Sequence, residues 1–326
     1  MTRTHVRPPA PREAPAEPGP SRRARAGAGR RRPFAWHRWS ALAFIAPLIT
    51  YLVLFYGYPL YRNIDLSIHD YTPRAFVQGD AEFTGLANFT DVVLSEAFGP
   101  AIWTTAVFTL ASIAVQYAIG LALAVFFRTS FPLSPVLRGM FLIPWLLPMI
   151  VSASTWSWML NSDHGIVNSV LSAFGIGQIN WLTSPEWALV SVIIANIWLG
   201  IPFNLVILYS GLQNVPDELY EAAALDGAGP WKRFWHVTMP LLRPVSAITL
   251  LLGLVYTLKV VDVIWIMTVG GPAGSSTTLA IWSYRRAFGT GQPDFSEAAA
   301  VGNLLIVLAL VFGAVHLYLQ RREARR

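Results

Sequence analysis

Two charged side chains lie inside an apolar stretch of the sequence and are the first candidates for chemistry. Lys259 and Asp262 fall in the segment Pro244–Val269, which is long and apolar enough to cross a bilayer as a helix. A charge near the centre of a membrane helix costs about 2.5–3.5 kcal/mol, so such residues are functional candidates by default. Spaced i and i+3 on one helix, they could form an intramembrane ion pair. The alternatives are coupling to an ion, for which Asp262 is the only deeply placed carboxylate, and a structural contact with a neighbouring subunit.

The residue types needed for covalent or metal chemistry are scarce. The chain has no Cys and only six scattered His, which leaves no thiolate nucleophile and no Cys-based metal site. There is no HExxH sequence, and no Ser stands near a His in a helix. The only lysines are Lys232 and Lys259, and neither follows the Gly-rich spacing of a Walker A loop. We therefore predict no catalytic residue and no metal or cofactor bound by this chain, which disfavours an intramembrane enzyme.

The composition is that of a membrane protein. Charged residues make up 13% of the chain, about half the share of a soluble domain, and hydrophobic residues make up 54%. Most of the positive excess lies in the two ends rather than among aromatic residues, so it favours lipid headgroups over nucleic acid. Residues 1–39 are rich in Pro, Arg, Ala and Gly, and we predict a disordered basic cytoplasmic tail there rather than a cleavable signal.

Six apolar segments can each cross the hydrocarbon layer as a helix. The predicted fold class is therefore an all-α membrane protein with six transmembrane helices over residues 40–320, followed by a basic tail at 321–326. The predicted spans are Ser40–Tyr61, Pro100–Phe127, Val136–Leu160, Trp187–Leu212, Pro244–Val269 and Glu297–Leu319.

The distribution of Lys and Arg predicts the orientation of these helices. With a cytoplasmic N-terminus, 19 of the 24 Lys and Arg residues lie on the cytoplasmic side. The opposite side then holds only Arg62, Arg74, Arg285 and Arg286, and its first loop is acidic. Both termini are therefore predicted to be cytoplasmic.

Helix-breaking residues interrupt three of the predicted helices. Pro144 and Pro148 fall in the third, Gly200 and Pro202 in the fourth, and Gly253 in the fifth. A proline removes one intrahelical hydrogen bond, and within a membrane the freed carbonyl must be satisfied by a neighbour or a cavity. The breaks indicate either a pathway through the protein or ordinary packing kinks.

The loop over residues 213–242 carries helix signals of its own. Pro216 lies at a first-turn position, Asp217 and Glu218 follow where the helix dipole favours anions, and Gly227 can supply a left-handed cap. A second helix is predicted to begin at Trp231 and to end at Met239-Pro240, completing a cytoplasmic hairpin over 216–240. The hairpin could lie on the membrane surface or dock into a soluble partner. One face of its first helix is made mostly of small residues, at Leu219, Ala222, Ala223 and Asp226.

The same loop resembles the EAA motif of binding-protein-dependent ABC importer permeases. Glu221-Ala222-Ala223 is followed by Gly227 and then by Val237-Thr238-Met239-Pro240 at the spacing of that motif, with Val237 and Met239 as conservative departures. The resemblance implies a type I importer fold whose loop forms a coupling helix that inserts into a nucleotide-binding subunit, which holds ATP and Mg²⁺. The implied coupling residues are Glu221, Ala222, Ala223, Asp226, Gly227 and Pro240.

Further segments are similar to the carbohydrate branch of that family, the maltose-permease-like subunits. They are Asn196–Phe203, Thr268–Pro272 and Tyr284–Phe288, and the likeness covers Ser40–Leu319. It implies a sugar pathway, where hydroxyl-pairing groups should stand beside an aromatic face. The alternative role for the same residues is helix packing. The implied pathway residues are Asn196, Leu199, Gly200 and Phe203 on one helix and Gly253, Tyr256, Thr257 and Val260 on the next.

Together these observations predict one permease subunit of an ATP-driven sugar importer in a bacterial cytoplasmic membrane. The resemblance implies a second homologous permease subunit in a heterodimer, a cytoplasmic ABC ATPase dimer, an extracytoplasmic sugar-binding protein and membrane lipid as partners, with no nucleic acid. The alternative is an ion-coupled secondary transporter, which would need inverted repeats and several acidic sites.

Overall fold

The computed structural model describes residues 36–129 and 131–323, which are mostly helical. They fall into two units, one ending at Tyr58 and one beginning at Pro59. The predicted disordered tail lies outside the described residues except for residues 36–39, which begin the first helix. The predicted C-terminal tail is helical as far as Glu323, and the rest of it lies outside the described residues.

The first unit is an apolar helix with exposed side chains. It comprises α1 (Trp36–Leu52), a π-helical segment η1 (Val53–Gly57) and the first residue of α2 (Tyr58–Ser67). Within η1 the backbone N–H of Tyr58 bonds to the carbonyl of Val53, five residues earlier. Proline has no N–H for the ladder, and this wider turn directly before Pro59 lets the helix continue past it.

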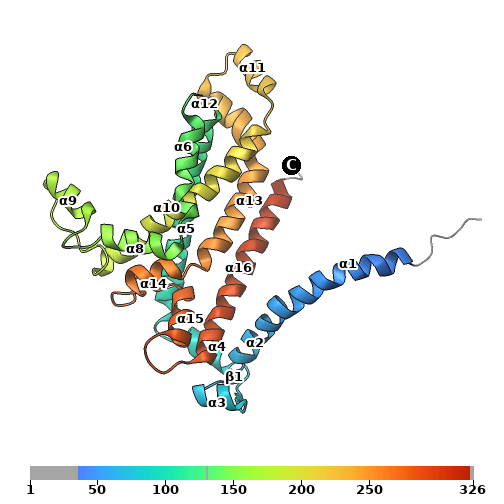
Figure 1. Ribbon diagram of the computed structural model, residues 1–326, viewed down its shortest axis with the longest axis vertical. Coiled ribbons are helices and arrows are strands. Elements are labelled where there is room, and N and C mark those ends of the chain that lie inside the picture. Colours follow the sequence, from blue (N-terminus) through green and yellow to red (C-terminus); the bar gives the residue numbers. More distant parts are fainter. Residues whose placement is uncertain (1–35, 130, 324–326) are drawn as a thin grey trace, which may run out of the picture. The chain divides into compact units, whose positions relative to one another are not determined.

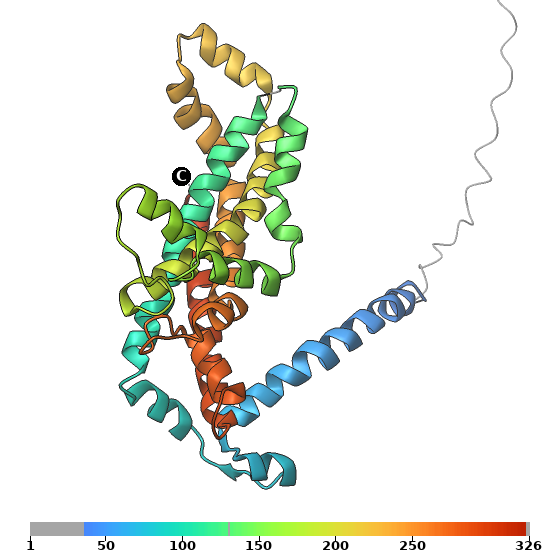
Figure 2. The ribbon, with the colours of Figure 1, turned by 60° about the vertical axis from the view of Figure 1, so that its left-hand side comes forward.

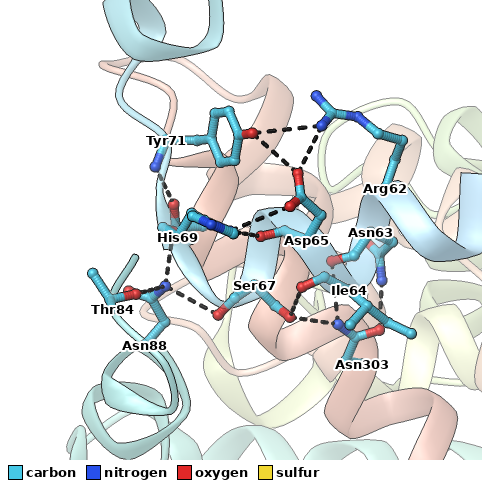
Figure 3. Close-up of polar contacts among 11 residues, drawn as sticks. Arg62, Asn63, Ile64, Asp65, Ser67, His69, Tyr71, Thr84, Asn88 and Asn303 are labelled. Atoms are coloured by element: carbon cyan, nitrogen blue, oxygen red, sulfur yellow. Dashed lines mark hydrogen bonds and ion pairs between the residues drawn. The ribbon is translucent and has the colours of Figure 1, made fainter. Parts of the chain in front are cut away.

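The second unit starts with a polar cap built around a short antiparallel ribbon (Figure 3). Its strands β1 (His69–Asp70) and β2 (Glu82–Phe83) pair His69 with Phe83, and they flank α3 (Pro73–Gln78). The Asn88 amide, on α4 (Ala87–Leu94), donates to the carbonyls of Ser67 and His69, both at 3.0 Å. The cap thereby fixes the end of α2 against the ribbon.

The same network joins α2 to the last helix, α16 (Phe295–Glu323). Asn63 donates its amide N–H to Asn303 Oδ1 at 2.6 Å, and Asn303 donates to Ser67 Oγ at 2.9 Å. Asp65 accepts hydrogen bonds from Arg62 at 2.7 Å and from Tyr71 at 3.0 Å. Several polar groups of the loop predicted to be external therefore satisfy one another within the protein.

Long helices form the body of the second unit, and they run side by side in both views (Figures 1 and 2). They are α5 (Phe98–Arg128), α10 (Pro185–Gln213), α13 (Met239–Leu258) and α16. Buried leucines of α5, α10 and α13, among them Leu121, Leu208 and Leu242, form one apolar core. α10 remains helical through Gly200 and Pro202, and α13 through Gly253, so the interruptions predicted at those residues are absent from the described helices.

The third predicted span is not a single helix. It consists of α6 (Ser134–Phe141), α7 (Ile143–Leu146) and α8 (Met149–Met159), followed by α9 (Ile166–Ala173). The helix breaks at Leu147, which is extended with ψ 140° directly before Pro148. A proline disfavours the helical conformation of the residue before it, which accounts for this break.

The hairpin over residues 216–240 forms, but its second arm does not end where we predicted. After α11 (Asp217–Leu225), the helix α12 (Pro230–Arg233) passes through the π-helical segment η2 (Phe234–Thr238) directly into α13. The N–H of Met239 bonds to the carbonyl of Phe234, as in η1, so Pro240 lies in the first turn of α13 instead of ending the helix. In Figure 1 α11 and α12 lie at the end of the second unit opposite α3 and β1.

The fifth predicted span is divided between two helices. α13 ends at Leu258 and α14 (Asp262–Thr268) begins four residues later, with Lys259, Val260 and Val261 between them. A loop then leads to α15 (Leu279–Phe288), which packs against α16. Buried residues of α5, α8, α10, α14 and α15 share a second apolar core.

Five helices in the described part of the chain are long and apolar enough to cross a membrane, one fewer than the six predicted. The predicted span that is missing is the third, because α6, α7 and α8 are each too short. The five helices cover Ala43–Ser67, Phe98–Arg128, Pro185–Gln213, Pro230–Leu258 and Phe295–Tyr318.

Candidate functional site

One cavity of about 370 Å³ gathers every residue predicted for a substrate pathway. α10 and the end of α13 supply most of its wall, and α5, α7, α8, α14 and the link between α13 and α14 supply the rest. The lining residues are Gln116, Trp145, Met149, Asn196, Leu199, Gly200, Phe203, Gly253, Tyr256, Thr257, Lys259, Val260 and Asp262.

The cavity contains a buried hydrogen-bond donor without a partner. Asn196 is only 6% exposed, and its side-chain Nδ2 makes no hydrogen bond among the described residues. Gln116, on α5, donates from Nε2 to the backbone carbonyl of Asn196 at 2.8 Å. A buried N–H left without an acceptor is costly, so the Asn196 amide is suited to an acceptor that enters the cavity.

Gly200 makes room for Gln116 within the wall. A Cβ atom at this position would lie 2.3–2.5 Å from the amide atoms of Gln116. Any larger residue would displace that amide, because contacts this short do not occur between real atoms. The absence of a side chain at Gly200 therefore leaves the space that the Gln116 amide occupies beside the cavity.

Aromatic rings form a second part of the wall. Phe203 lies edge-to-face with Tyr256, with ring centroids 5.7 Å apart, and Trp145 lies edge-to-face with Phe203 at 6.4 Å. Rings in this arrangement offer C–H edges and π faces to a ligand. The cavity thus combines polar amides with an aromatic wall.

Lys259 and Asp262 line the cavity but do not form the predicted ion pair. No salt bridge joins them within residues 36–129 and 131–323, and the Lys259 ammonium instead lies 5.0 Å from the centroid of the Tyr256 ring. The prediction assumed one continuous helix, whereas Lys259 follows the last residue of α13 and Asp262 begins α14. The break removes the i, i+3 geometry.

The predicted coupling residues form a separate, exposed surface on and after α11. Gly227 has φ 76°, its N–H bonds to the Ala224 carbonyl, and the N–H of Ala228 bonds to the Ala223 carbonyl. This is a Schellman cap, which confirms the predicted left-handed role of Gly227. Leu225, at the end of the helix, is 90% exposed, and Glu221, Ala222 and Asp226 are exposed as well. Pro240 lies apart from this surface, in α13.

The opposite side of α11 faces the helix bundle. Asp217 accepts an ion-paired hydrogen bond from Arg128, at the end of α5, at 2.6 Å. The Arg128 guanidinium also lies 3.6 Å from the centroid of the Tyr220 ring, and the Tyr220 hydroxyl is 2.9 Å from Thr238 Oγ1 in η2. These contacts fix the start of α11, while its far end projects outward.

Three cavity residues were not predicted from the sequence: Gln116, Trp145 and Met149. Gln116 is a polar residue in the apolar run Phe98–Arg128, and that contrast was a usable signal because polar groups in membrane helices need partners. Trp145 and Met149 gave no such signal, since aromatic and Met side chains are common in apolar helices. Their place in the wall depends on the turn at Leu147 and Pro148.

The site is suited to reversible recognition. Among the described residues no group of three or more His, Asp or Glu side chains could hold a metal ion. The cavity offers amide and hydroxyl hydrogen-bonding groups, aromatic edges and two opposite charges that are free of ion pairs in the described structure. Such a lining fits a polar small molecule that also has an apolar face.

Comparison with known proteins gives consistent matches. The family model described as binding-protein-dependent transport system inner membrane component matches residues 116–325. The trehalose/maltose transport system permease protein of Thermococcus litoralis is 35% identical over 278 residues, covering 85% of this chain and 92% of that protein. The lactose transport system permease protein of Rhizobium radiobacter is 32% identical over 285 residues, covering 86% and 93%.

A solved structure shares the fold. It is a chain of a bacterial alginate ABC transporter, crystallised in complex with a periplasmic protein bound to an alginate pentasaccharide. The match has a TM-score of 0.74 at 24% identity and covers 88% of this chain and 96% of that one.

Proposed function

Because the chain belongs to the family of binding-protein-dependent transport system inner membrane components, we propose that it is a permease subunit of an ATP-driven sugar importer. It forms half of a translocation pathway in a bacterial cytoplasmic membrane, with both termini on the cytoplasmic side. Its substrate is an oligosaccharide or a sugar derivative. This family membership favours ATP-driven import over the ion-coupled alternative.

The cavity between α10 and α13 is the observation that carries the proposal. A sugar presents hydroxyl groups around its ring and C–H groups on its faces, so it needs hydrogen-bonding side chains beside aromatic ones. The cavity supplies both, with the unpaired Nδ2 of Asn196 and the Phe203–Tyr256 ring pair. A second homologous permease subunit would complete the pathway from the other side, and an extracytoplasmic sugar-binding protein would deliver the substrate.

Coupling to ATP hydrolysis is assigned to the hairpin over residues 216–240. The small side chains of Ala222, which is exposed, and of Ala223, which is partly buried, let another surface approach α11 closely, and the exposed Glu221 and Asp226 add charge at its edge. A cytoplasmic ABC ATPase dimer would bind this surface and supply the ATP and Mg²⁺ sites, which are proposed to lie outside this chain. The Schellman cap at Gly227 gives the end of α11 a fixed shape for that contact.

The test is uptake of labelled di- and oligosaccharides by cells that lack this chain and are complemented with variants. We expect Phe203→Ala to reduce uptake of the cognate sugar about tenfold, because it removes one ring of the aromatic wall. Phe312→Ala is the matched control, since Phe312 is an exposed residue of α16 outside the cavity. Assembly of the transporter should be unchanged in both variants.

Two results would contradict the proposal. One is normal uptake of every saccharide tested in cells that lack the chain. The other is equal loss of assembly and uptake in Phe203→Ala, which would assign Phe203 to helix packing.

A further inference from the structure

A second cavity lies behind α11 and shares no residue with the first. It has a volume of about 430 Å³ and is bounded by the ends of α5 and α10, the start of α11, α12 and η2. Its wall combines two arginines with one carboxylate, hydroxyl groups and apolar side chains. The lining residues are Val125, Arg128, Thr129, Leu212, Asp217, Tyr220, Pro230, Arg233, Phe234 and Thr238.

Arg233 brings a positive charge to this cavity without a partner. Its Nε is buried and makes no hydrogen bond, and no salt bridge in the described part of the chain involves its side chain. The only carboxylate in the wall, Asp217, is engaged by Arg128. Arg233 as a whole is partly exposed, but its Nε–H is buried without an acceptor, which is costly. The wall also carries two arginines against one carboxylate. An anion is the missing component.

The residues next to Arg233 are typical of a membrane surface. Trp231 is 73% exposed and Trp235 is 49% exposed, and their rings lie 5.9 Å apart. Phe234 lies between them in the sequence and contacts both rings. Exposed tryptophans beside basic residues mark the headgroup level of a bilayer, and basic pockets between helices on the cytoplasmic side bind anionic lipid headgroups.

We infer that this cavity binds the phosphate of an anionic phospholipid headgroup between Arg233 and Arg128, with Trp231 and Trp235 resting in the lipid interface. The inference rests on the proposed function for its orientation, which places the hairpin on the cytoplasmic side. The phosphate oxygens accept hydrogen bonds from Arg233 and from Arg128, which also donates to Asp217. The bound lipid then contacts the same arginine that fixes the start of α11.

A carboxylate of the ATPase is a less suitable occupant of this cavity. The outward surface of α11 carries Glu221 and Leu225, whereas the cavity is walled by Asp217 and Tyr220 on the side that contacts α5 and η2. A subunit seated on the outward surface would leave this cavity on the bundle side of α11. The apolar residues Val125 and Leu212 form the part of the wall next to the helix core.

The experiment measures lipids retained by the full transporter complex, purified through a tag on this chain and exchanged with phosphatidylglycerol or phosphatidylcholine. Quantitative mass spectrometry should show preferential retention of phosphatidylglycerol. Arg233→Gln should lower that retention about tenfold, because it removes one charged hydrogen-bond partner. Arg243→Gln is the matched control, since it removes an exposed charge of α13 outside the cavity. Arg233→Lys keeps the charge and should retain an intermediate amount.

The outcomes separate the sources of phosphate. Displacement of phosphatidylglycerol by millimolar glycerol 3-phosphate supports the phosphate site and assigns it to a soluble ester, whereas no displacement assigns it to lipid. Equal retention in Arg233→Gln and Arg243→Gln overturns the inference, as does an ATPase carboxylate found on Arg233 in the assembled complex. If Arg233→Gln fails to fold, the inference is tested by the retention in Arg233→Lys and by the preference of the wild-type complex for phosphatidylglycerol over phosphatidylcholine. Lipid retention is measured without sugar or transport, so its failure is distinct from failure of the proposed function.

Discussion

The surface of α11 and the cavity between α10 and α13 are built in opposite ways. The α11 surface is one continuous segment whose end has few neighbours, and its shape depends on the backbone, above all on the left-handed Gly227. The cavity takes side chains from six helices and the short link between α13 and α14, and its shape depends on side-chain volume, as at Gly200 and Gln116. Because of this difference, we expect a change in backbone conformation to damage the α11 surface and a change in side-chain volume to damage the cavity.

The largest effect is expected from Gly227→Val. At φ 76° a β-branched residue is strained by about 1–3 kcal/mol, although a Cβ atom there would meet nothing within 4 Å. The strain should displace the end of α11, lower uptake more than tenfold and uncouple ATP hydrolysis from uptake, without changing affinity for the binding protein. Uptake and ATPase assays on the same membranes measure this.

Gly229→Ala is the matched control for that prediction. Gly229 has φ −67°, and a Cβ atom there also has open space, so alanine is tolerated by the backbone. Gly227→Asn, which can adopt the left-handed conformation, should keep most of the uptake. If Gly227→Val kept wild-type coupling, the backbone conformation at residue 227 would not control the function of the α11 surface.

An intermediate effect is expected from Gly200→Ala in the cavity. The added Cβ atom would collide with the amide of Gln116, so uptake should fall about fivefold with a raised KM for the sugar. Replacing Gln116 with Ser in the same chain should restore part of the loss, and a double-mutant cycle measures that interaction. Gly253→Ala lines the same cavity but would meet no atom within 4 Å, so it should be nearly neutral. Equal losses in Gly200→Ala and Gly253→Ala would show that volume is not the controlling property.

The smallest effect is expected from Asp217→Asn. The carboxylate is 87% exposed, and exposed ion pairs contribute about 0–1 kcal/mol, so the loss of its pairing with Arg128 should lower the free energy of unfolding by less than about 1 kcal/mol. Thermal unfolding at low and high salt measures it, and the difference from wild type should shrink as salt screens the pair. A large loss of stability would mean that α11 is held by this one contact rather than by several.

The same contrast explains which features could be predicted from the sequence. The start of α11 at Asp217 and its cap at Gly227 depend on residues close in sequence, so local helix signals were sufficient. The cavity residues on α10 and α13 were predicted from the resemblance of these segments to the carbohydrate branch of the family, and the structure brings them together. Gln116 was missed because its partner is a carbonyl eighty residues away.

Backbone irregularities account for the predictions that were wrong. We predicted that a helix ends at Pro240, but the π-helical turn of η2 lets the helix continue past this proline. The turn at Leu147 and the break after Leu258 divided spans that had been predicted as single helices. In each case, whether the helix continues or breaks depends on which backbone groups find hydrogen-bond partners in the folded protein. Hydropathy along the sequence does not report those partners.

The helical run from Pro230 to Leu258 has a mechanical consequence. Its 29 residues span about 44 Å, so one continuous helical run reaches from the hairpin to the cavity. Thr238, in the hairpin half of this run, contacts Tyr220 of α11, whereas Tyr256 and Thr257 lie at the far end of the run and line the cavity. A tilt of only about 5° would displace one end by about 4 Å relative to the other. The π-helical turn of η2 therefore keeps this helical run continuous past Pro240, and a movement of the hairpin can be transmitted to the cavity wall through a single helix.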